Sequence, residues 1–338
     1  MRLVVGALLL FSFCAGCEDS KETAGAGAGG AAASSGSATV TSGATTTTAG
    51  SSTASSTTGA GGSFALEVHT LLDAEPGLVL EVNLPFGVAE CLDVPGDPPC
   101  ADLDDDDIVD AWEDAALSRL RPMLRLDEDE SLVGDATAVV GDVGRVTRSG
   151  DLLQVHIMLG YSKDYGSCGG FTSHNGDSER VALQLVPLSG MGPGDVRVSK
   201  AYTAAHEGTA NDHGRVFIGA ELTELVHVPD PETGEPRWVV FPSADKHATY
   251  ATIQICEGIS VVPCFEEDCA PDGVADPSAY DLLPPYVNAG EEAAPLVTDL
   301  AVVGFGGDDA WADQDFCGGL GGSSCSSSVR EKLTVDPF

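Results

Sequence analysis

The apolar and polar positions along the chain divide it into three parts. A mainly apolar stretch, residues 3–13, precedes residues 23–63, which are Gly, Ala, Ser and Thr apart from Val40. Short apolar stretches separated by turn-forming residues begin at Phe64. A segment of small and polar residues cannot bury a core and behaves as a flexible coil. We therefore expect residues 64–338 to form the folded part of the chain.

Within this folded part the hydrophobic pattern is mostly that of β-strands. Short apolar or alternating runs bounded by Gly, Pro, Asn and Asp are typical of strands. The segments with this pattern are 78–82, 138–140, 152–159, 181–186, 197–201, 216–218 and 238–241. Apolar residues recur at helical spacing at Trp112, Ala116 and Leu120, and Pro122 ends this predicted helix. We expect a mainly β fold, a single β-sandwich domain with one or two short helices and disulfide-bounded loops.

The N-terminal segment has the features of an export signal. Arg2 precedes an apolar stretch that is too short to span a bilayer as a helix. The stretch ends in small residues before Cys17, which resembles the bacterial motif in which such a cysteine is lipidated. We expect a signal peptide at 1–16, then lipidated Cys17 and a disordered tether, together 17–63. The lipid would anchor the protein to a membrane of the cell envelope, at the outer membrane or cell surface. The alternative is an ordinary cleaved signal with an incidental cysteine.

The charge balance is strongly acidic. The chain has 53 Asp and Glu against 16 Lys and Arg, a formal net charge of −37 at pH 7. Proteins that bind nucleic acid present clusters of basic residues to the phosphates, so a nucleic-acid partner is not expected. The acidity fits calcium-rich surroundings, and the alternative is that it serves solubility alone. The oligomeric state is not indicated.

The cysteines indicate disulfides. Ten occur, of which Cys14 leaves with the signal and Cys17 carries the lipid. An even number then remains in an exported chain, which favours disulfide bonds. Two local pairs are predicted, Cys91–Cys100 and Cys317–Cys325, and the other four cysteines are not paired by the sequence: Cys168, Cys256, Cys264 and Cys269.

An acidic loop precedes the predicted helix. Carboxylates stand at positions 1, 3, 5, 9 and 12 of a calcium-loop pattern, with the residues Asp102, Asp104, Asp106, Asp110 and Glu113. Crowded carboxylates repel one another unless a cation lies between them. The sixth position of such loops is usually Gly, whereas here it is Asp107. We expect this loop to bind Ca²⁺, and the alternative is a solvated acidic helix start that favours the helix dipole.

A second group of candidate ligands lies in His174-Asn-Gly-Asp177-Ser-Glu179, with Asp164 upstream and a strand-like run after it. One imidazole and several carboxylates at the mouth of a strand are typical ligands of divalent cations. We expect Ca²⁺ or Mg²⁺ here. The same groups would also suit acid–base hydrolysis, or form a plain polar turn in which Glu179 pairs with a base such as Arg180.

Several segments resemble the family of proteins related to vacuolar protein sorting-associated protein 62, over roughly residues 102–335. The matching motifs are Tyr161…Asp164-Tyr165, His174…Asp177…Glu179, Tyr202…His206…Gly208, Ser243…His247-Ala248…Tyr250, Phe316–Gly319 and Val329–Leu333. The chain has one residue more than the family between Ser243 and His247. The resemblance implies that His206 and His247 lie near the cation site, while the alternative for each is a hydrogen-bonded core histidine.

A more distant resemblance is to the necrosis-inducing, ethylene-inducing-peptide-like cytolysins. Their motif Gly-His-Arg-His-Asp-Trp-Glu has the same spacing as His174, Asp177 and Glu179, and the resemblance implies that these three residues bind a divalent cation. Asp164 is the nearest candidate for the upstream Asp of that family. Three positions differ, since the chain has Ser173, Gly176 and Ser178. Membrane damage depends on other loops and does not follow.

These features together predict a surface-anchored lipoprotein with a calcium-stabilised β-sandwich. Its divalent-cation site would bind a glycan, a lipid head group or another extracellular ligand. Two alternatives remain, a metal-dependent extracellular hydrolase and a structural envelope protein in which calcium serves stability alone. The chain has neither the Gly-x-Ser-x-Gly motif of a nucleophile elbow nor a P-loop, so the residues do not favour nucleophilic or nucleotide chemistry.

Overall fold

A computed structural model describes the folded part of the chain, in residues 64–130, 139–165, 174–207, 212–257, 267–269, 271, 273–289 and 332–338. All of these residues belong to one compact unit, Thr57–Phe338. The predicted signal peptide, Cys17, the tether and the Cys317–Cys325 pair lie outside the described residues. None of the helices in the described part is long and apolar enough to cross a membrane.

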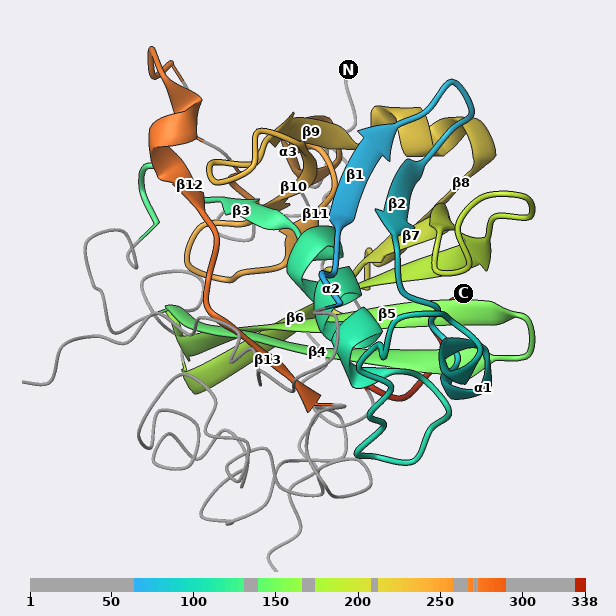
Figure 1. The fold of residues 1–338 in the computed structure, drawn as a ribbon. Helices are drawn as coiled ribbons and strands as arrows, with labels where there is room; N and C mark the ends of the chain where they lie inside the picture. The colour runs from blue at the N-terminus through green and yellow to red at the C-terminus, as the bar shows by residue number, and fades with distance from the viewer. Residues whose placement is uncertain are drawn as a thin grey trace, which may run out of the picture. The chain divides into compact units, whose positions relative to one another are not determined.

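The larger sheet has eight strands and contains the longest strands of the described structure (Figure 1). Its strand order is β1-β2-β7-β6-β5-β4-β13, and β8 pairs with β7. The strands are β1 (Val68–Leu72), β2 (Leu78–Val82), β4 (Val139–Ser149), β5 (Leu152–Asp164), β6 (His174–Pro187), β7 (Val196–Thr203), β8 (Arg215–Ile218) and β13 (Tyr286–Asn288). Neighbouring strands are antiparallel except β4 and β13, which are parallel.

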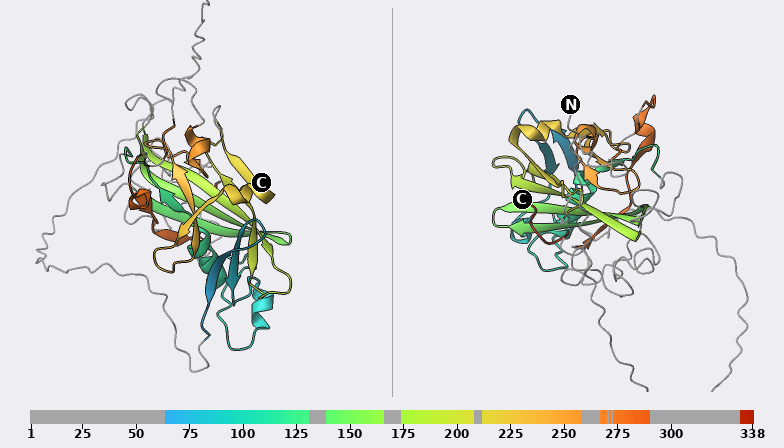
Figure 2. Two further views of the ribbon diagram at one scale, coloured as in Figure 1. Left: turned by 90° about the horizontal axis from the view of Figure 1, so that it is seen from above. Right: turned by 180° about the vertical axis from the view of Figure 1, so that it is seen from behind.

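The smaller sheet has five strands in the order β11-β10-β3-β12, with β9 paired to β10. The strands are β3 (Met123–Arg125), β9 (Val226–Pro229), β10 (Pro236–Pro242), β11 (Thr249–Tyr250) and β12 (Asp281–Leu282). The helices are α1 (Val88–Leu92), α2 (Asp110–Leu120) and α3 (Ile253–Glu257), and two 3-10 turns are η1 (Gly219–Glu224) and η2 (Pro277–Tyr280). Both views of Figure 2 show β4, β5 and β6 side by side as the long green strands.

One apolar core is shared by the two sheets and α2. It contains Leu183 of β6, Val240 of β10 and Trp112 of α2, all buried. The indole of Trp112 donates to the carbonyl oxygen of Gly194 at 3.0 Å, so its polar atom is satisfied inside the core. A Cβ on Gly144 of β4 would lie 2.3 Å from a methyl group of Leu117, so the close packing of α2 on this strand requires glycine. The predicted mainly β sandwich with few short helices is confirmed.

The outer face of the larger sheet is covered in part by the C-terminal residues 332–338. Arg180 of β6 donates through Nη1 to the carbonyl oxygen of Val335 at 2.8 Å. Lys332 Nζ donates to Ser178 Oγ at 3.0 Å. Phe338 packs against a small buried cluster on the same face. Alternate residues of β6 therefore hold the C-terminal segment, while the residues between them face the core.

Two disulfides lie in the described residues. Cys91–Cys100 has a Cα–Cα distance of 5.8 Å, which confirms the predicted local pair. Cys256–Cys269, with 6.1 Å between the Cα atoms, was not paired by the sequence. It joins α3 to residues 267–269, and so fixes that short segment beside the smaller sheet.

Acid is expected to destabilise the protein through His156, a fully buried residue of β5. Burial, with help from the charges of Arg180 and Arg145, lowers the pKa of His156 to about 4. A histidine whose folded-state pKa is depressed stabilises the fold above its unfolded pKa of 6.5, and this stability is lost as pH falls toward 4. The loss amounts to about 3 kcal/mol.

Urea unfolding of wild type and His156→Gln between pH 7 and pH 4 tests this expectation. The variant should show a shallower fall in unfolding free energy, whereas the exposed control His213→Gln should follow the wild type. Equal slopes for all three proteins would contradict the role of His156.

Candidate cation sites

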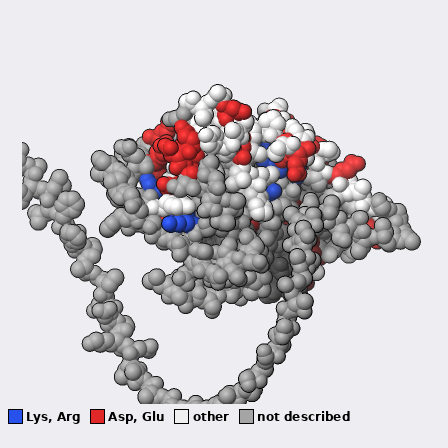
Figure 3. All heavy atoms as spheres, turned by 90° about the vertical axis from the view of Figure 1, so that its left-hand side faces the viewer, with Lys and Arg blue, Asp and Glu red and all other residues white. Residues whose placement is uncertain are grey.

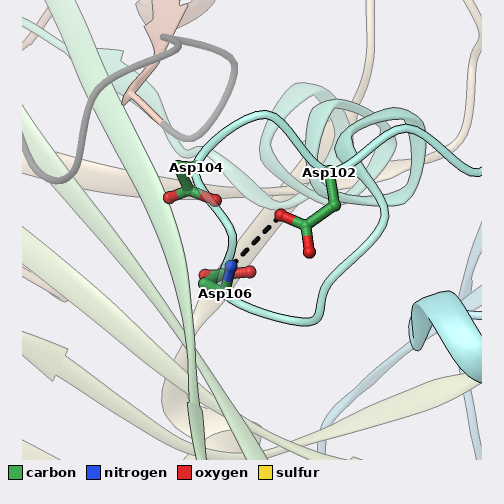
Figure 4. Close-up of side chains that lie close together, drawn as sticks. All are labelled: Asp102, Asp104 and Asp106. Atoms are coloured by element: carbon green, nitrogen blue, oxygen red, sulfur yellow. Dashed lines mark hydrogen bonds between the residues drawn. The ribbon is translucent and has the colours of Figure 1, made fainter.

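The acidic loop brings three carboxylates together. Ligand oxygens of Asp102, Asp104 and Asp106 all lie within 4.8 Å of one another, and Figure 4 shows the three side chains gathered on one turn. Leu103 and Asp105, which alternate with them along the chain, are exposed, while the three aspartates are half-buried. In the part of the chain that the structure describes, this is the one group of at least three acidic, His or Cys ligands that meets this distance.

The loop backbone is shaped by its own carboxylates. Asp102 accepts from the amides of Asp106 at 3.1 Å and Asp107 at 3.0 Å, the first of which is drawn in Figure 4. Asp110 accepts from the amide of Leu103 at 3.0 Å and begins α2. Asp107, at the sixth position, has φ of 70°. This is the left-handed conformation that glycine usually supplies at that point of a calcium loop, and Asp is among the residues that tolerate it.

Glu113 is the twelfth residue of the loop and lies in the first turn of α2. The residue is 0% exposed, and neither carboxylate oxygen has a hydrogen-bond partner among the described residues. One oxygen each of Asp104 and Asp106 is likewise buried without a partner there. Burial, followed by the charges of Asp106 and Asp104, raises the pKa of Glu113 to about 9. Buried carboxylates of this kind are costly unless a cation compensates them, and an all-oxygen donor set is the one that calcium takes.

The second candidate site lies at the N-terminal end of β6. The register pairs Tyr161 with Asp177 and Leu159 with Glu179. Asp177 and Glu179 alternate in phase with the core residue Val181, so they lie on the inward face of the sheet. Glu179 is 6% exposed, and its Oε2 has no hydrogen-bond partner within the described structure. Burial raises the pKa of Glu179 to about 8, although the charge of Lys332 opposes the rise.

His247 connects two carboxylates at this end of the sandwich. Its Nδ1 lies 3.0 Å from Asp177 Oδ2 and its Nε2 lies 3.6 Å from Glu130 Oε2. The ring is fully buried and stacks on Tyr161, with centroids 4.0 Å apart and planes at 7°. Burial alone would lower the pKa of His247, but the hydrogen bond with Asp177 and the nearby negative charge of Glu130 raise it to about 9. His247 is therefore a buried, positively charged group that is hydrogen-bonded to Asp177 and forms a longer ion pair with Glu130.

His206 has a different partner. Its Nε2 lies 2.9 Å from Glu267 Oε1, and Lys246 Nζ lies 3.3 Å from the same oxygen. The hydrogen bond to Glu267 raises the pKa of His206. Burial would raise the pKa of Glu267, but its hydrogen bond to His206 helps to hold it below the ordinary value. Glu267 belongs to the short segment that the Cys256–Cys269 disulfide fixes, so the disulfide also positions this pair.

The predicted set Asp164, His174, Asp177 and Glu179 is described only in part. Asp164 of β5 pairs with His174 of β6. This pair lies three residues along the strands from the pair Tyr161 and Asp177. The side chain of His174 lies outside the described residues. Ligand atoms of Asp164, Asp177 and Glu179 do not form a group within 4.8 Å in the described structure. Cation binding by the four residues together stays a prediction.

Two acidic residues near these histidines were not predicted. Glu130 ends the acidic run 127–130, and Glu267 lies in the acidic run 266–268 before Cys269. In the sequence, each of these residues belongs to a run of acidic residues. Such runs are usually solvated, so the sequence does not show which residue of the run is buried. On the face shown in Figure 3, acidic side chains form larger areas than basic ones among the described residues. An acidic run is therefore an ordinary feature of this chain and does not by itself indicate a functional residue.

Comparisons with known proteins give distant similarity alone. No protein-family model matches the chain, and no curated protein matches it. One similar structure, described as a toxin fold for microbial attack and plant defense, has 14% identity and a TM-score of 0.32, covering 61% of this chain and 82% of that chain. Another, described as NLPPya in complex with glucosamine, has 13% identity and a TM-score of 0.35, covering 67% and 91%. This similarity assigns neither family nor function.

Proposed function

We propose that the protein is an extracytoplasmic binding module, anchored through lipidated Cys17, that uses a divalent cation to bind an oxygen-rich ligand such as a glycan or a lipid head group. Asp177 and Glu179 would hold this cation, Ca²⁺ or Mg²⁺, with His174 and Asp164 as further ligands. The acidic loop would hold a separate Ca²⁺ that stabilises the domain.

The observation that carries the proposal is the environment of Glu179. A buried carboxylate, one of whose oxygens has no partner among the described residues, lies on the same inward face as Asp177. Buried ionised groups are normally paired or coordinate metals. A cation bridging these two carboxylates would supply the missing partner and would offer its remaining coordination positions to ligand oxygens.

The neighbours of Asp177 orient it for such a role. His247 Nδ1 lies 3.0 Å from Oδ2, and the amide of Ser178 donates to Oδ1 at 2.8 Å. These two hydrogen bonds, one to each carboxylate oxygen, hold the group in a fixed orientation. Groups that orient a metal ligand in this way commonly change metal affinity by about 10- to 100-fold. His247 is thus assigned a positioning role.

Glu179→Gln is expected to lower the number of bound divalent cations by one and to weaken cation-dependent binding to glycan arrays or liposomes by about tenfold or more. The amide keeps the size of the side chain but loses the charge. Isothermal titration with Ca²⁺ and Mg²⁺ measures the first effect, and adhesion with and without chelator measures the second. Glu75→Gln, at an exposed position, is the matched control and should behave like the wild type.

Unchanged cation number and unchanged adhesion in Glu179→Gln would overturn the proposal for this site. A different result would favour a structural envelope protein. In that case only Glu113→Gln would lose a bound cation, and neither the wild type nor any variant would show cation-dependent adhesion. A hydrolase is favoured by one observation, the burial of Glu179 beside Asp177, because burial raises the pKa of this carboxyl group and so favours its use as a proton donor. Turnover of esters, phosphates or glycosides that is lost in Glu179→Gln would establish that alternative.

A further inference from the structure

Arg145 of β4 lies against the acidic loop. Strand β13 pairs with β4 as far as Gly144, so Arg145 is the next residue beyond that pairing. Its Nη2 is 3.8 Å from Asp104 Oδ2, and its side chain is 17% exposed. Its Nε is buried and has no hydrogen-bond partner in the described part of the chain. A strand remote in sequence therefore supplies a cation to a loop that otherwise gathers carboxylates.

The charge of Arg145 acts on the side chains whose buried oxygens have no partner among the described residues. Burial raises the pKa of Asp104, Asp106 and Glu113, and the positive charge of Arg145 opposes the rise at each of them. The 3.8 Å approach to Asp104 is longer than a charge-assisted hydrogen bond, which is about 2.7–2.9 Å. Arg145 thus compensates the loop electrostatically and does not satisfy the hydrogen-bonding needs of its carboxylates.

We propose that Arg145 is an internal competitor of Ca²⁺ at the acidic loop, holding the loop in the calcium-free protein and setting its calcium affinity low. The inference rests on the calcium site proposed above. A guanidinium close to the ligands repels a divalent ion that occupies the same cluster. Extracellular calcium modules work with dissociation constants of about 10⁻⁴ to 10⁻³ M, and ligand charge is one determinant of that value. With Arg145 present, the loop fills at millimolar calcium and not at the far lower concentrations of the cytoplasm.

The test is a calcium titration of the full chain carrying Arg145→Gln. The loop site is isolated by working in the Glu179→Gln background, and binding is followed by isothermal titration calorimetry. The dissociation constant is expected to fall by about tenfold or more, because a repulsive unit charge is removed while the ligands stay. Arg145→Lys keeps the charge and should remain close to the unsubstituted protein.

The matched control is Arg197→Gln, which makes the same change in net charge. Arg197 forms an exposed ion pair with Asp73 at 2.7 Å, and calcium affinity should not change in this variant. Circular dichroism shows whether Arg145→Gln is folded. If the folded variant binds calcium no more tightly than the protein with Arg145, Arg145 does not compete with calcium. If Arg145→Gln does not fold, the calcium dissociation constant is measured in Arg145→Ala and Arg145→Met instead, with the same expected result. If Glu113→Gln binds calcium as the wild type does, the calcium site itself is wrong, which is a separate outcome.

Discussion

Replacing Glu113 by glutamine is expected to remove the calcium-dependent part of the stability of the protein. In the wild type, calcium at about one hundred times its dissociation constant should stabilise the fold by about 2.7 kcal/mol. That raises the melting temperature by roughly 5–10 °C for a domain of this size. The variant loses the last carboxylate of the loop, so chelation should no longer change its melting temperature. Differential scanning calorimetry with and without chelator measures the effect.

The calcium-free state provides a second readout for the same variant. Glu113 is fully buried and its oxygens have no partner among the described residues, so a neutral amide should not lower the stability of the calcium-free protein. The control is Glu232→Gln, at an exposed position, which should keep the full response to chelator. An equal calcium response in Glu113→Gln and wild type would show that this carboxylate does not bind the ion.

Replacing His247 by alanine is expected to lower the free energy of unfolding by about 3–5 kcal/mol. The change removes a buried cation from between Asp177 and Glu130 and leaves both carboxylates without it. It also removes the ring that stacks on Tyr161 and leaves a cavity in its place. Urea unfolding monitored by circular dichroism measures the loss.

The comparison for His247→Ala is His213→Ala, since His213 is exposed. A change on the protein surface away from special features is usually within about 0.5 kcal/mol. A loss below about 1 kcal/mol in His247→Ala would contradict the view that this histidine is a buried, charged link between the two carboxylates.

The sequence was a good guide where the structure depends on local pattern. The alternation around residues 152–159 and 181–186 predicted the strands that became β5 and β6. The helical spacing of Trp112 and Leu120 predicted α2, which ends at Leu120 shortly before Pro122. Residues close in the chain have a narrow choice of conformations, and alternation already places Asp177 and Glu179 on one face.

Contacts between distant segments were not accessible in this way. Glu130, Asp177 and His247 come from three parts of the chain, and only the packing of the two sheets brings them together. Asp177 and His247 were candidates from their motifs, but nothing in the sequence distinguishes Glu130 from its acidic neighbours at 127–129. The approach of Arg145 to the acidic loop is similar, because it depends on how β4 lies beside residues 102–106. The Cys256–Cys269 pair likewise has no local signal that sets it apart from the other cysteines.

The two faces of β6 have different roles, so the register in which β6 pairs with β5 matters. Inward residues Asp177 and Glu179 alternate with Ser178 and Arg180, which hold the C-terminal segment. A slip by one residue against β5 would exchange the two sets and turn the guanidinium of Arg180, now buried under the C-terminal segment, into the apolar core. The C-terminal segment would then lose its attachments at the same moment. The contacts of residues 332–338 with Ser178 and Arg180 therefore add to the stability of the register in which Asp177 and Glu179 face inward.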